Sequence, residues 1–396
     1  MPLVKSAVVA FDSTRGSSSL RIASLPRPEA AERIAAFDYL RVFVIFLVVV
    51  HHAVMAYCTG GEAAHGGSYT NGSAPVVDTV AWAGFNLIVQ WNDGFFMPLM
   101  FLLAGLFVRP SLARKGLGRH LADRALRLGV PLLVGVATVI PLAYYATYLQ
   151  AGGSGGFGAF WVHMVTRGPW PSGPLWFLGA LLVFDLATVL VLQHVDLRRM
   201  TAAWDRLASG RQFLVFFALA TLAYLPARVL IGGSFWLTAG PFGIQACRIG
   251  LYAFFFAAGA IVGADRVAAL FDRHWLRWPL LAAVATALLV AADGQSLPDW
   301  LDGAVIVVFA TAMAAGLLAL AVRFGRRHTA IGDNLSANAY GIYVLHWPIV
   351  LWLQLALVLT PFGAVTKGLL AIVAGFGLSW LAAALLRAVP GVSRVL

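Results

Sequence analysis

The chain has 396 residues, of which 60% are hydrophobic and 11% are charged, whereas soluble domains carry about 25% charged residues. This balance argues against a string of soluble domains, and repeated apolar runs of about twenty residues predict transmembrane helices instead. The net charge of +11 comes from short basic clusters between the apolar runs. No basic stripe with interleaved aromatic residues occurs, so the charge does not indicate a nucleic-acid partner.

The N-terminal segment differs in composition from the rest of the chain. Residues 1–33 mix Pro, Ser, Arg and Glu, and the apolar stretch Ala7–Phe11 is too short for the hydrophobic part of a signal peptide. We interpret residues 1–33 as a cytoplasmic, disordered tail and residues 34–390 as a transmembrane domain.

Ten apolar runs follow this tail, and we expect each to cross the membrane as a helix. They lie at 37–58, 80–108, 129–149, 174–194, 212–231, 243–263, 278–293, 302–322, 338–358 and 366–387. The second run contains Pro98 and several polar residues, so it is either one kinked helix or two pieces. The predicted fold class is therefore an all-α integral membrane bundle of about ten helices.

The basic residues indicate how this bundle is oriented. Twenty-four of the 28 Lys and Arg residues lie in every second connection between the runs or in the two terminal segments. The other four are Arg167, Arg228, Arg248 and Lys367. The positive-inside rule then places both termini in the cytoplasm of a multi-pass protein in the inner (cytoplasmic) membrane, with lipid around it.

Two arginines on the predicted outer side break this pattern. Arg228 and Arg248 lie near the outer ends of the fifth and sixth runs, and three interpretations are open. They pair with an outer carboxylate, bind an anionic group of a substrate, or reach back to the lipid headgroups. The candidate carboxylates are Asp293, Asp299 and Asp302.

Other isolated residues are given structural roles. We expect Asp185, within the fourth run, to be the buried partner of another polar group. Cys58 and Cys247 lie near the outer ends of their runs, and small apolar packing is favoured over a disulfide between them. Neither belongs to a metal-ligand spacing, so no metal site is predicted.

The first run contains three polar residues that we regard as functional. His52 follows Arg41 by eleven residues, which is about 20° past three full helical turns, so the two side chains share a face. Asp38 lies within about 40° of His52 on that face. Along a helix His52 is about 16 Å deeper than Arg41, near the bilayer centre.

His51 points about 80° away from this face, so one histidine is expected to pack on a neighbouring helix while the other lines a cavity. An ionisable residue at the bilayer centre costs several kcal/mol unless it is paired or hydrated. A histidine there either joins two helices by a hydrogen bond or performs chemistry. Because Asp38, Arg41 and His52 line one face, we favour catalysis, with the imidazole as a general base or a nucleophile.

A second polar stripe occurs in the ninth run. Tyr340, Tyr343 and His346 are spaced by three residues, so their side chains form a slowly turning row along a helix. This row either faces the same cavity as His52 or makes hydrogen bonds between helices. Both interpretations stay open at this point.

The motifs together resemble the membrane-bound acyltransferase-3 family. The resemblance rests on five segments in family order: Asp38-Tyr-Leu-Arg41 with His52, Phe96 to Gly105, Asp123 to Leu128 closing in Val130-Pro131, Leu175-Trp176-Phe177-Leu178, and Ser336 to His346. They span nearly the whole apolar region. Their layout is most similar to members that acylate periplasmic glucans, the glucan biosynthesis protein C-like enzymes.

The resemblance implies an O-acyltransferase with cytoplasmic acyl-CoA as the donor. The acyl group would be of the acetyl or succinyl type, and the acceptor a hydroxyl of a carbohydrate or other glycan at the outer face. His52 matches the family's essential histidine, with Asp38 beside it as a catalytic candidate. Arg41, Arg124 and Arg127 are candidates for binding acyl-CoA, because Arg suits phosphate oxygens. Trp176, Tyr340, Tyr343 and His346 are candidate cavity or substrate residues.

Two departures from the family pattern bear on these expectations. Ala104 replaces the serine before the glycine of the second segment, so no hydroxyl is available there. Phe96 occupies a position where some glucan-modifying members have arginine, which weakens the match to that subgroup. The alternative function is a transporter that uses His52, Arg41 and Asp38 as a relay, but such proteins often show an internal repeat and none is visible here.

Overall fold

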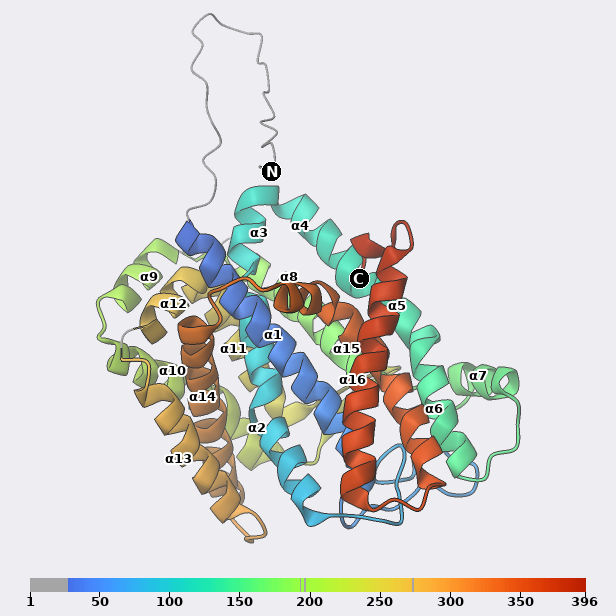
Figure 1. Ribbon diagram of the computed structural model, residues 1–396. Coiled ribbons are helices and arrows are strands. Elements are labelled where there is room, and N and C mark those ends of the chain that lie inside the picture. The colour runs from blue at the N-terminus through green and yellow to red at the C-terminus, as the bar shows by residue number, and fades with distance from the viewer. Residues whose placement is uncertain (1–27, 193, 196, 273) are drawn as a thin grey trace, which may run out of the picture.

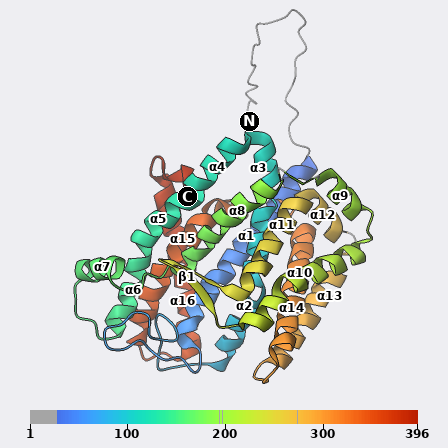
Figure 2. The ribbon, with the colours of Figure 1, turned by 180° about the vertical axis from the view of Figure 1, so that it is seen from behind.

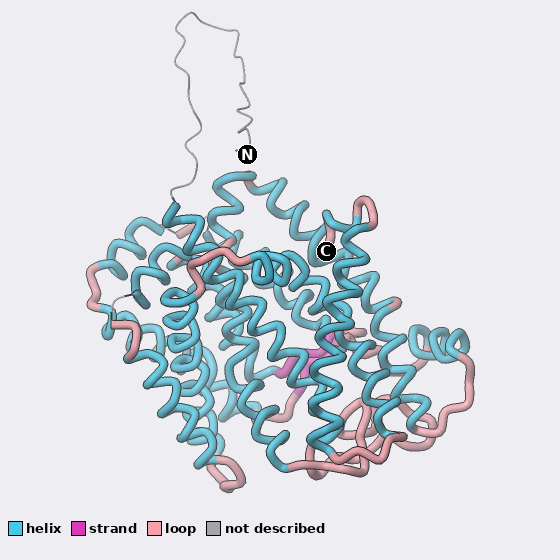
Figure 3. The backbone as a smooth tube through the Cα atoms, viewed as in Figure 1, coloured by secondary structure: helices cyan, strands magenta, loops and turns pink. Residues whose placement is uncertain are grey.

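The computed structural model describes residues 28–192, 194–195, 197–272 and 274–396, and its regular structure is almost entirely helical (Figure 1, Figure 3). The α-helices are α1 (Pro28–Val54), α2 (Ala83–Gly105), α3 (Val108–Lys115), α4 (Leu117–Arg124), α5 (Val130–Ala137), α6 (Val139–Gln150), α7 (Phe157–Thr166), α8 (Trp176–Leu192), α9 (Leu197–Asp205), α10 (Ser209–Ile231), α11 (Ile249–Val262), α12 (Ala264–Asp272), α13 (Arg277–Ala292), α14 (Asp299–Phe324), α15 (Ala330–Val358) and α16 (Ala364–Ala388). Of the predicted tail, residues 1–27 lie outside the described residues, and α1 begins at Pro28.

Short turns and a β-hairpin complete the described part of the chain. The 3-10 turns are η1 (Met55–Tyr57), η3 (Gly173–Leu175), η4 (Ala246–Arg248) and η5 (Val392–Arg394), and η2 (Ala125–Gly129) is a π turn. Strands β1 (Trp236–Ala239) and β2 (Phe242–Gln245) form an antiparallel hairpin between α10 and α11. The hairpin is mostly exposed and lies on the face of the bundle seen from behind (Figure 2).

The predicted class, an all-α membrane bundle, is confirmed. In the described part of the chain, eight helical spans are long and apolar enough to cross a membrane. Ala246–Val262 and Ala264–Phe271 meet at an angle of 94°, and they make a ninth span when the two helices are counted as one. The remaining predicted run contains α13, whose 16 residues rise about 24 Å, less than the roughly 30 Å hydrocarbon layer. α13 packs lengthwise on α14 (Figure 1).

The second predicted run forms one span rather than two pieces. α2 and α3 together make a continuous apolar span, Ala83–Lys115, with Pro98 inside α2. Proline removes one backbone hydrogen bond of the helix and is tolerated in membrane helices where neighbours compensate. Pro98 is buried among those neighbours.

Small residues allow the helices at the centre of the bundle to approach closely. A side chain at Gly105 of α2 would collide with the backbone carbonyl of Phe256 in α11, and one at Gly259 of α11 would collide with the carbonyl of Leu102. Reciprocal glycines of this kind are how membrane helices gain contact when lipid offers no hydrophobic driving force. The glycine of the second family-like segment therefore has a packing role.

The segments rich in Lys and Arg gather at one end of the bundle, near the visible start of α1 and the C-terminus (Figure 1). α3, α4, α9 and α12 lie there, whereas the loop 58–82 and the connection between α13 and α14 lie at the other end. We refer to these as the basic end and the opposite end.

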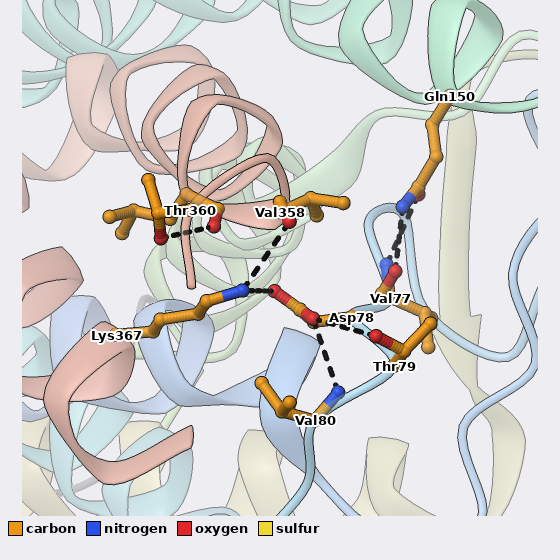
Figure 4. Close-up of polar contacts among 9 residues, drawn as sticks. Val77, Asp78, Thr79, Val80, Gln150, Val358, Thr360 and Lys367 are labelled. Atoms are coloured by element: carbon orange, nitrogen blue, oxygen red, sulfur yellow. Dashed lines mark hydrogen bonds and ion pairs between the residues drawn. The ribbon is translucent and has the colours of Figure 1, made fainter. Parts of the chain in front are cut away.

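The loop 58–82 is tied to the helices at the opposite end by buried polar contacts (Figure 4). The Lys367 ammonium of α16 lies 2.7 Å from the Asp78 carboxylate, and both side chains are almost completely buried. The Asp78 carboxylate also accepts a hydrogen bond from the backbone N–H of Val80 at 3.1 Å. Beside it, the Gln150 side chain of α6 exchanges two hydrogen bonds with the backbone of Val77. The loop is therefore fixed to two helices.

Both cysteines are free thiols, so the disulfide between Cys58 and Cys247 does not form. Cys247 is fully buried and Cys58 is half-buried, in agreement with their interpretation as packing residues.

Candidate active site

His52 lies in the last turn of α1, and the Asp38–Arg41 pair lies toward the other end of the same helix. Arg41 is 3.0 Å from the Asp38 carboxylate, one helical turn apart. Asp38 precedes His52 by fourteen residues, which is about 21 Å along a helix. Asp38 and Arg41 therefore cannot touch the atoms on which His52 would act.

The end of α1 is held by a side chain of α15. The last carbonyls of a helix lack partners within the helix. Here the Gln354 amide donates hydrogen bonds to the carbonyls of His52, at 2.8 Å, and Ala53, at 3.1 Å. This contact fixes the backbone of His52 against α15.

His52 forms a hydrogen bond with His346, and its geometry assigns the protons of both rings. His346 Nδ1 is 2.6 Å from the Tyr343 carbonyl, which can only accept, so Nδ1 carries the proton. In a neutral imidazole, His346 Nε2 is then an acceptor. It faces His52 Nδ1 at 3.1 Å, so His52 Nδ1 donates. The lone pair of His52 is therefore on Nε2.

This arrangement gives His52 the two properties of a general base. Its Nε2 lone pair can accept a proton, and its ring is oriented by a fully buried neighbour. The hydrogen bond from Nδ1 also becomes stronger once the imidazole is protonated, because a charged donor makes a stronger bond. The relation between base and orienting group is the one that activates hydroxyl nucleophiles in acyl transfer.

Aromatic rings enclose this pair on the side of the loop 58–82. The Trp347 ring meets the His52 ring edge to face, with centroids 4.7 Å apart. Tyr144 packs against Trp347, and Tyr69 of the loop packs against Tyr144. The Tyr69 hydroxyl donates to the Pro169 carbonyl at 2.7 Å. The loop thus contributes to the wall of the histidine site.

His51 faces a different helix, as expected for adjacent histidines. Its ring stacks on Phe96 of α2 with centroids 5.2 Å apart, and it lies at 83° to the His52 ring. Phe96, which departs from the arginine of some glucan-modifying members, therefore lies directly against the histidine pair. The structure separates a packing histidine from one that faces the polar row of α15.

The polar row of α15 meets the segment before α8. The Tyr343 hydroxyl donates to the Pro174 carbonyl, and its ring packs on Phe177. Trp176, next to Phe177, stacks on Tyr252 of α11 with centroids 5.8 Å apart. Two family-like segments more than 150 residues apart in the sequence are thus in contact beside His52.

Arg124 belongs to a buried polar network at the basic end. Its Nε lies 3.3 Å from the Asp185 carboxylate of α8. The other Asp185 oxygen lies 2.8 Å from His120 Nε2, and His120 Nδ1 lies 3.0 Å from the Ser111 hydroxyl. Asp185 was expected to be the buried partner of another polar group, and the structure shows that this group is His120, with Arg124 beside it.

Arg127 follows within the π turn η2, where the helix is locally widened. Its backbone carbonyl accepts a hydrogen bond of 2.5 Å from the Tyr340 hydroxyl, and its side chain is exposed. Such turns are rare and frequently mark functional sites. Tyr340 therefore links α15 to the basic end, whereas His346 belongs to the histidine site and Tyr343 contacts the segment before α8.

The two outer arginines are both paired with carboxylates. Arg228 contacts Asp299 at 2.5 Å and Asp302 at 2.9 Å, which confirms two of the three predicted candidates. Arg248 instead contacts Asp93 of α2, at 2.5 Å, so the expectation of a carboxylate from the outer loop is wrong for this residue. Asp93 lies within the second run, and no pattern in the sequence indicated that Arg248 would pack against it.

Several site residues were missed in the sequence. His120 lies four residues before Arg124 and so on the same helical face, a spacing that would have revealed it. Trp347 follows His346 directly, but its position against His52 depends on how α15 meets α1. Gln354 and Asp93 had no local signal, because each acts on a helix distant in sequence.

The sequence profile of a family described as an acyltransferase domain matches residues 34–384. The match covers most of the chain and every residue of the site, so this protein belongs to the acyltransferase-3 family of membrane proteins. The predicted family and the predicted enzyme class, an acyltransferase for groups other than amino-acyl groups, are confirmed, and the transporter alternative is set aside. The resemblance to the glucan-modifying subgroup stays a prediction. Neither the curated proteins nor the solved structures gave a match.

Proposed function

We propose that this membrane acyltransferase moves an acetyl- or succinyl-type group from acyl-CoA to a hydroxyl of a carbohydrate. The donor binds at the basic end, on the cytoplasmic side of the inner membrane, and the acceptor approaches from the periplasmic side. The observation that carries the proposal is the His52–His346 pair, in which His52 is oriented with a free lone pair on Nε2.

The proposed reaction is a general-base acyl transfer. His52 Nε2 accepts the proton of the acceptor hydroxyl while the hydroxyl oxygen forms a bond to the thioester carbonyl carbon. The carbon–sulfur bond then breaks, and the departing thiolate of CoA takes the proton from His52. The products are an ester and free CoA, and His52 returns to its neutral form.

The donor site in this proposal is formed by arginines of the basic end. CoA carries a pyrophosphate and a further phosphate, which suit the planar donors of arginine. Arg124 is 26% exposed despite its contact with Asp185, so a phosphate can reach it. Arg127 is exposed one turn further along. Arg41 lies on the helix that leads to His52, and Asp38 acts here as the residue that positions Arg41.

The catalytic role of His52 is tested by acyl transfer from radiolabelled acetyl- or succinyl-CoA in purified membranes. We expect His52→Ala to lower the transfer rate by about 10²–10⁴-fold, the usual contribution of a general base. His51→Phe is the matched control, because it keeps the ring stack on Phe96 and should retain near wild-type transfer. If His52→Ala is folded and fully active, the assignment is wrong.

The donor site has a separate test. We expect Arg124→Ala and Arg127→Ala each to raise the Michaelis constant for acyl-CoA several-fold, with a smaller change in kcat. Arg323→Ala at the same end, on α14, controls for loss of basic charge alone. An unchanged Michaelis constant would remove Arg124 and Arg127 from the donor site.

A further inference from the structure

A polar cavity of about 540 Å³ lies at the outer end of α10, away from the basic end. Its polar lining comes from Tyr224 and Arg228 of α10, Ser234 just before the hairpin, Gln245 of the hairpin, Arg248 before α11, and Asp299 and Asp302 of α14. The volume falls in the usual range of small-molecule sites, about 300–1,000 Å³. Neither the family match nor the proposed chemistry at His52 accounts for this cavity.

The charged side chains that line the cavity, two arginines and two aspartates, sum to zero, and Asp93 behind them adds one negative charge. Arg228 is engaged by Asp299 and Asp302 together, and Arg248 is engaged by Asp93 behind it. An anionic ligand would have to displace carboxylates that already hold both guanidinium groups. A neutral ligand meets no such cost, so the lining favours a molecule that hydrogen-bonds without carrying charge.

The side chains that line the cavity offer a hydroxyl group both a hydrogen-bond acceptor and a hydrogen-bond donor. The Asp299 and Asp302 side chains are 54% and 40% exposed, which leaves carboxylate oxygens free to accept. The guanidinium and amide groups of the lining donate. A hydroxyl both donates and accepts, so a ligand rich in hydroxyls fits this mixture better than a purely accepting or purely donating one.

An exposed aromatic ring stands beside the cavity. Trp236 lies directly opposite Gln245 in the hairpin ladder, so both side chains project from the same face of the ribbon. Gln245 lines the cavity, and Trp236 is 53% exposed. An indole ring offers a flat apolar surface with one polar edge, which suits the apolar face of a sugar ring.

Arg248 joins the cavity to α2 and α11, whose side chains pack around the histidine site. Arg248 donates to the Asp93 carbonyl at 2.8 Å, and Asp93 is one helical turn from Phe96, which stacks on His51. On its other side, Arg248 lies 3.5 Å from the Tyr252 hydroxyl, and Tyr252 stacks on Trp176. A chain held in the cavity is therefore anchored to the two helices that flank the histidine site.

We propose that this cavity binds a neutral carbohydrate segment of the acyl acceptor. Ser234, Gln245 and Arg228 with its two aspartate partners determine which segment is selected. The inference deepens and rests on the proposed function, in which a carbohydrate hydroxyl reaches His52 from this side. It places the recognition of the acceptor on α10, the hairpin and α14, apart from the reacting atoms.

The first test measures binding to the purified full-length protein in lipid nanodiscs. The probe is a neutral gluco-oligosaccharide of five residues, compared with a glucuronic-acid oligomer of the same length. Ser234→Trp fills the cavity, whereas Ala239→Trp adds the same side chain to an exposed hairpin position outside it. We expect the neutral oligomer to bind, Ser234→Trp to raise its Kd at least tenfold, and Ala239→Trp to change it less than twofold.

Three results would overturn the proposal: no binding of the neutral oligomer, equal Kd for Ser234→Trp and the wild type, or tighter binding of the acidic oligomer. The last result would point to an anionic ligand, such as a lipid headgroup.

The second test measures alkali-labile acyl esters on envelope carbohydrate in cells that produce each variant. We expect Ser234→Trp to lose at least nine-tenths of the esters that depend on His52, while Ala239→Trp keeps them and both proteins bind acyl-CoA. Ester formation by Ser234→Trp at the wild-type level would contradict the inference. If wild-type cells form no His52-dependent esters although the oligomer binds as expected, the proposed function fails while the carbohydrate site stands.

Discussion

At the scale of single residues, two hydrogen bonds of His346 determine which nitrogen of His52 can accept a proton. The Tyr343 carbonyl places a proton on His346 Nδ1, and this in turn makes His346 Nε2 an acceptor for His52. Replacement of His346 would leave His52 free to rotate and to exchange its tautomers. His346 is thus a positioning residue for the proposed base.

We expect His346→Phe to lower the rate of acyl transfer by about 10²-fold, because the base loses its orienting partner. His346→Gln should retain more activity, since its side-chain carbonyl can accept from His52 Nδ1. The measurements are kcat, which should fall, and the Michaelis constant for acyl-CoA, which should change little. Equal activity of the Gln and Phe variants would show that the hydrogen bond has no role.

The residues of the site differ in how far the sequence revealed them. His52 and the row of α15 were visible as polar residues at helical spacing in apolar runs, and the structure joins them. The pairing of Arg248 with Asp93 was hidden, because it depends on how α11 crosses α2. Asp38 and Arg41 shared a helical face with His52, but the distance along the helix separates their roles.

At the scale of helices, close contact between α2 and α11 depends on Gly105 and Gly259. Each glycine faces a backbone carbonyl of the other helix, and a backbone cannot move aside as a flexible side chain can. This contact holds α2, which carries Asp93 and Phe96, against α11, which follows Arg248. The glycines therefore position the helices that flank the proposed active site.

We expect Gly105→Ala to destabilise the protein by about 1–3 kcal/mol, the usual effect of overpacking. Gly377→Ala in α16 is the matched control, because nothing lies within 4 Å of an added side chain there, and it should change stability by less than about 1 kcal/mol. Thermal unfolding in detergent measures both. Equal midpoints for the two variants would contradict the close contact.

The ion pair that joins the loop 58–82 to α16 is a second contact between segments far apart in the chain. This pair of Asp78 and Lys367 is buried, and removal of one charge leaves the other without a partner (Figure 4). Since Tyr69 of this loop packs toward the histidine site through Tyr144, the loop position bears on the wall around His52.

We expect Lys367→Met to destabilise the protein by about 3–5 kcal/mol, because the Asp78 carboxylate is left buried and unpaired. The double variant Lys367→Met with Asp78→Asn should recover part of this loss, since the amide is neutral and still accepts from the Val80 N–H. Thermal unfolding and protease sensitivity of the loop provide the measurements. If the double variant recovers no stability, the unpaired Asp78 charge is not the cause of the loss in Lys367→Met.

At the scale of the whole molecule, the distribution of charge is the basis for the proposed direction of acyl transfer. The basic segments, α4 with Arg124 and the start of α1 lie at one end, whereas the loop 58–82 lies at the other (Figure 1). His52 lies in the last turn of α1, at the end of that helix away from Asp38 and Arg41. This order fits a donor and an acceptor that approach from opposite sides.

We expect the basic end to face the cytoplasm, in accordance with the positive-inside rule. In a background of Cys58→Ser and Cys247→Ser, Ala63→Cys in the outer loop should react with a membrane-impermeant maleimide in intact cells. Ala113→Cys in α3 should react only after the membrane is opened. The reverse pattern would invert the proposed direction of acyl transfer.

The sequence by itself determined the class of the molecule. Its apolar runs require helices because a backbone in lipid must satisfy its own hydrogen bonds, and its ordered motifs identified the family before any contact was known. It also singled out His52, because an ionisable residue in such a run is costly unless it has a partner.

Only the tertiary structure decided what that partner is. His346 lies 294 residues from His52, Asp185 lies 65 from His120, and Arg248 lies 155 from Asp93. Helical periodicity specifies which side of a helix a residue occupies but not which helix it will face. That choice depends on the packing of small residues and the sharp bend after α11, which act between segments far apart in the chain.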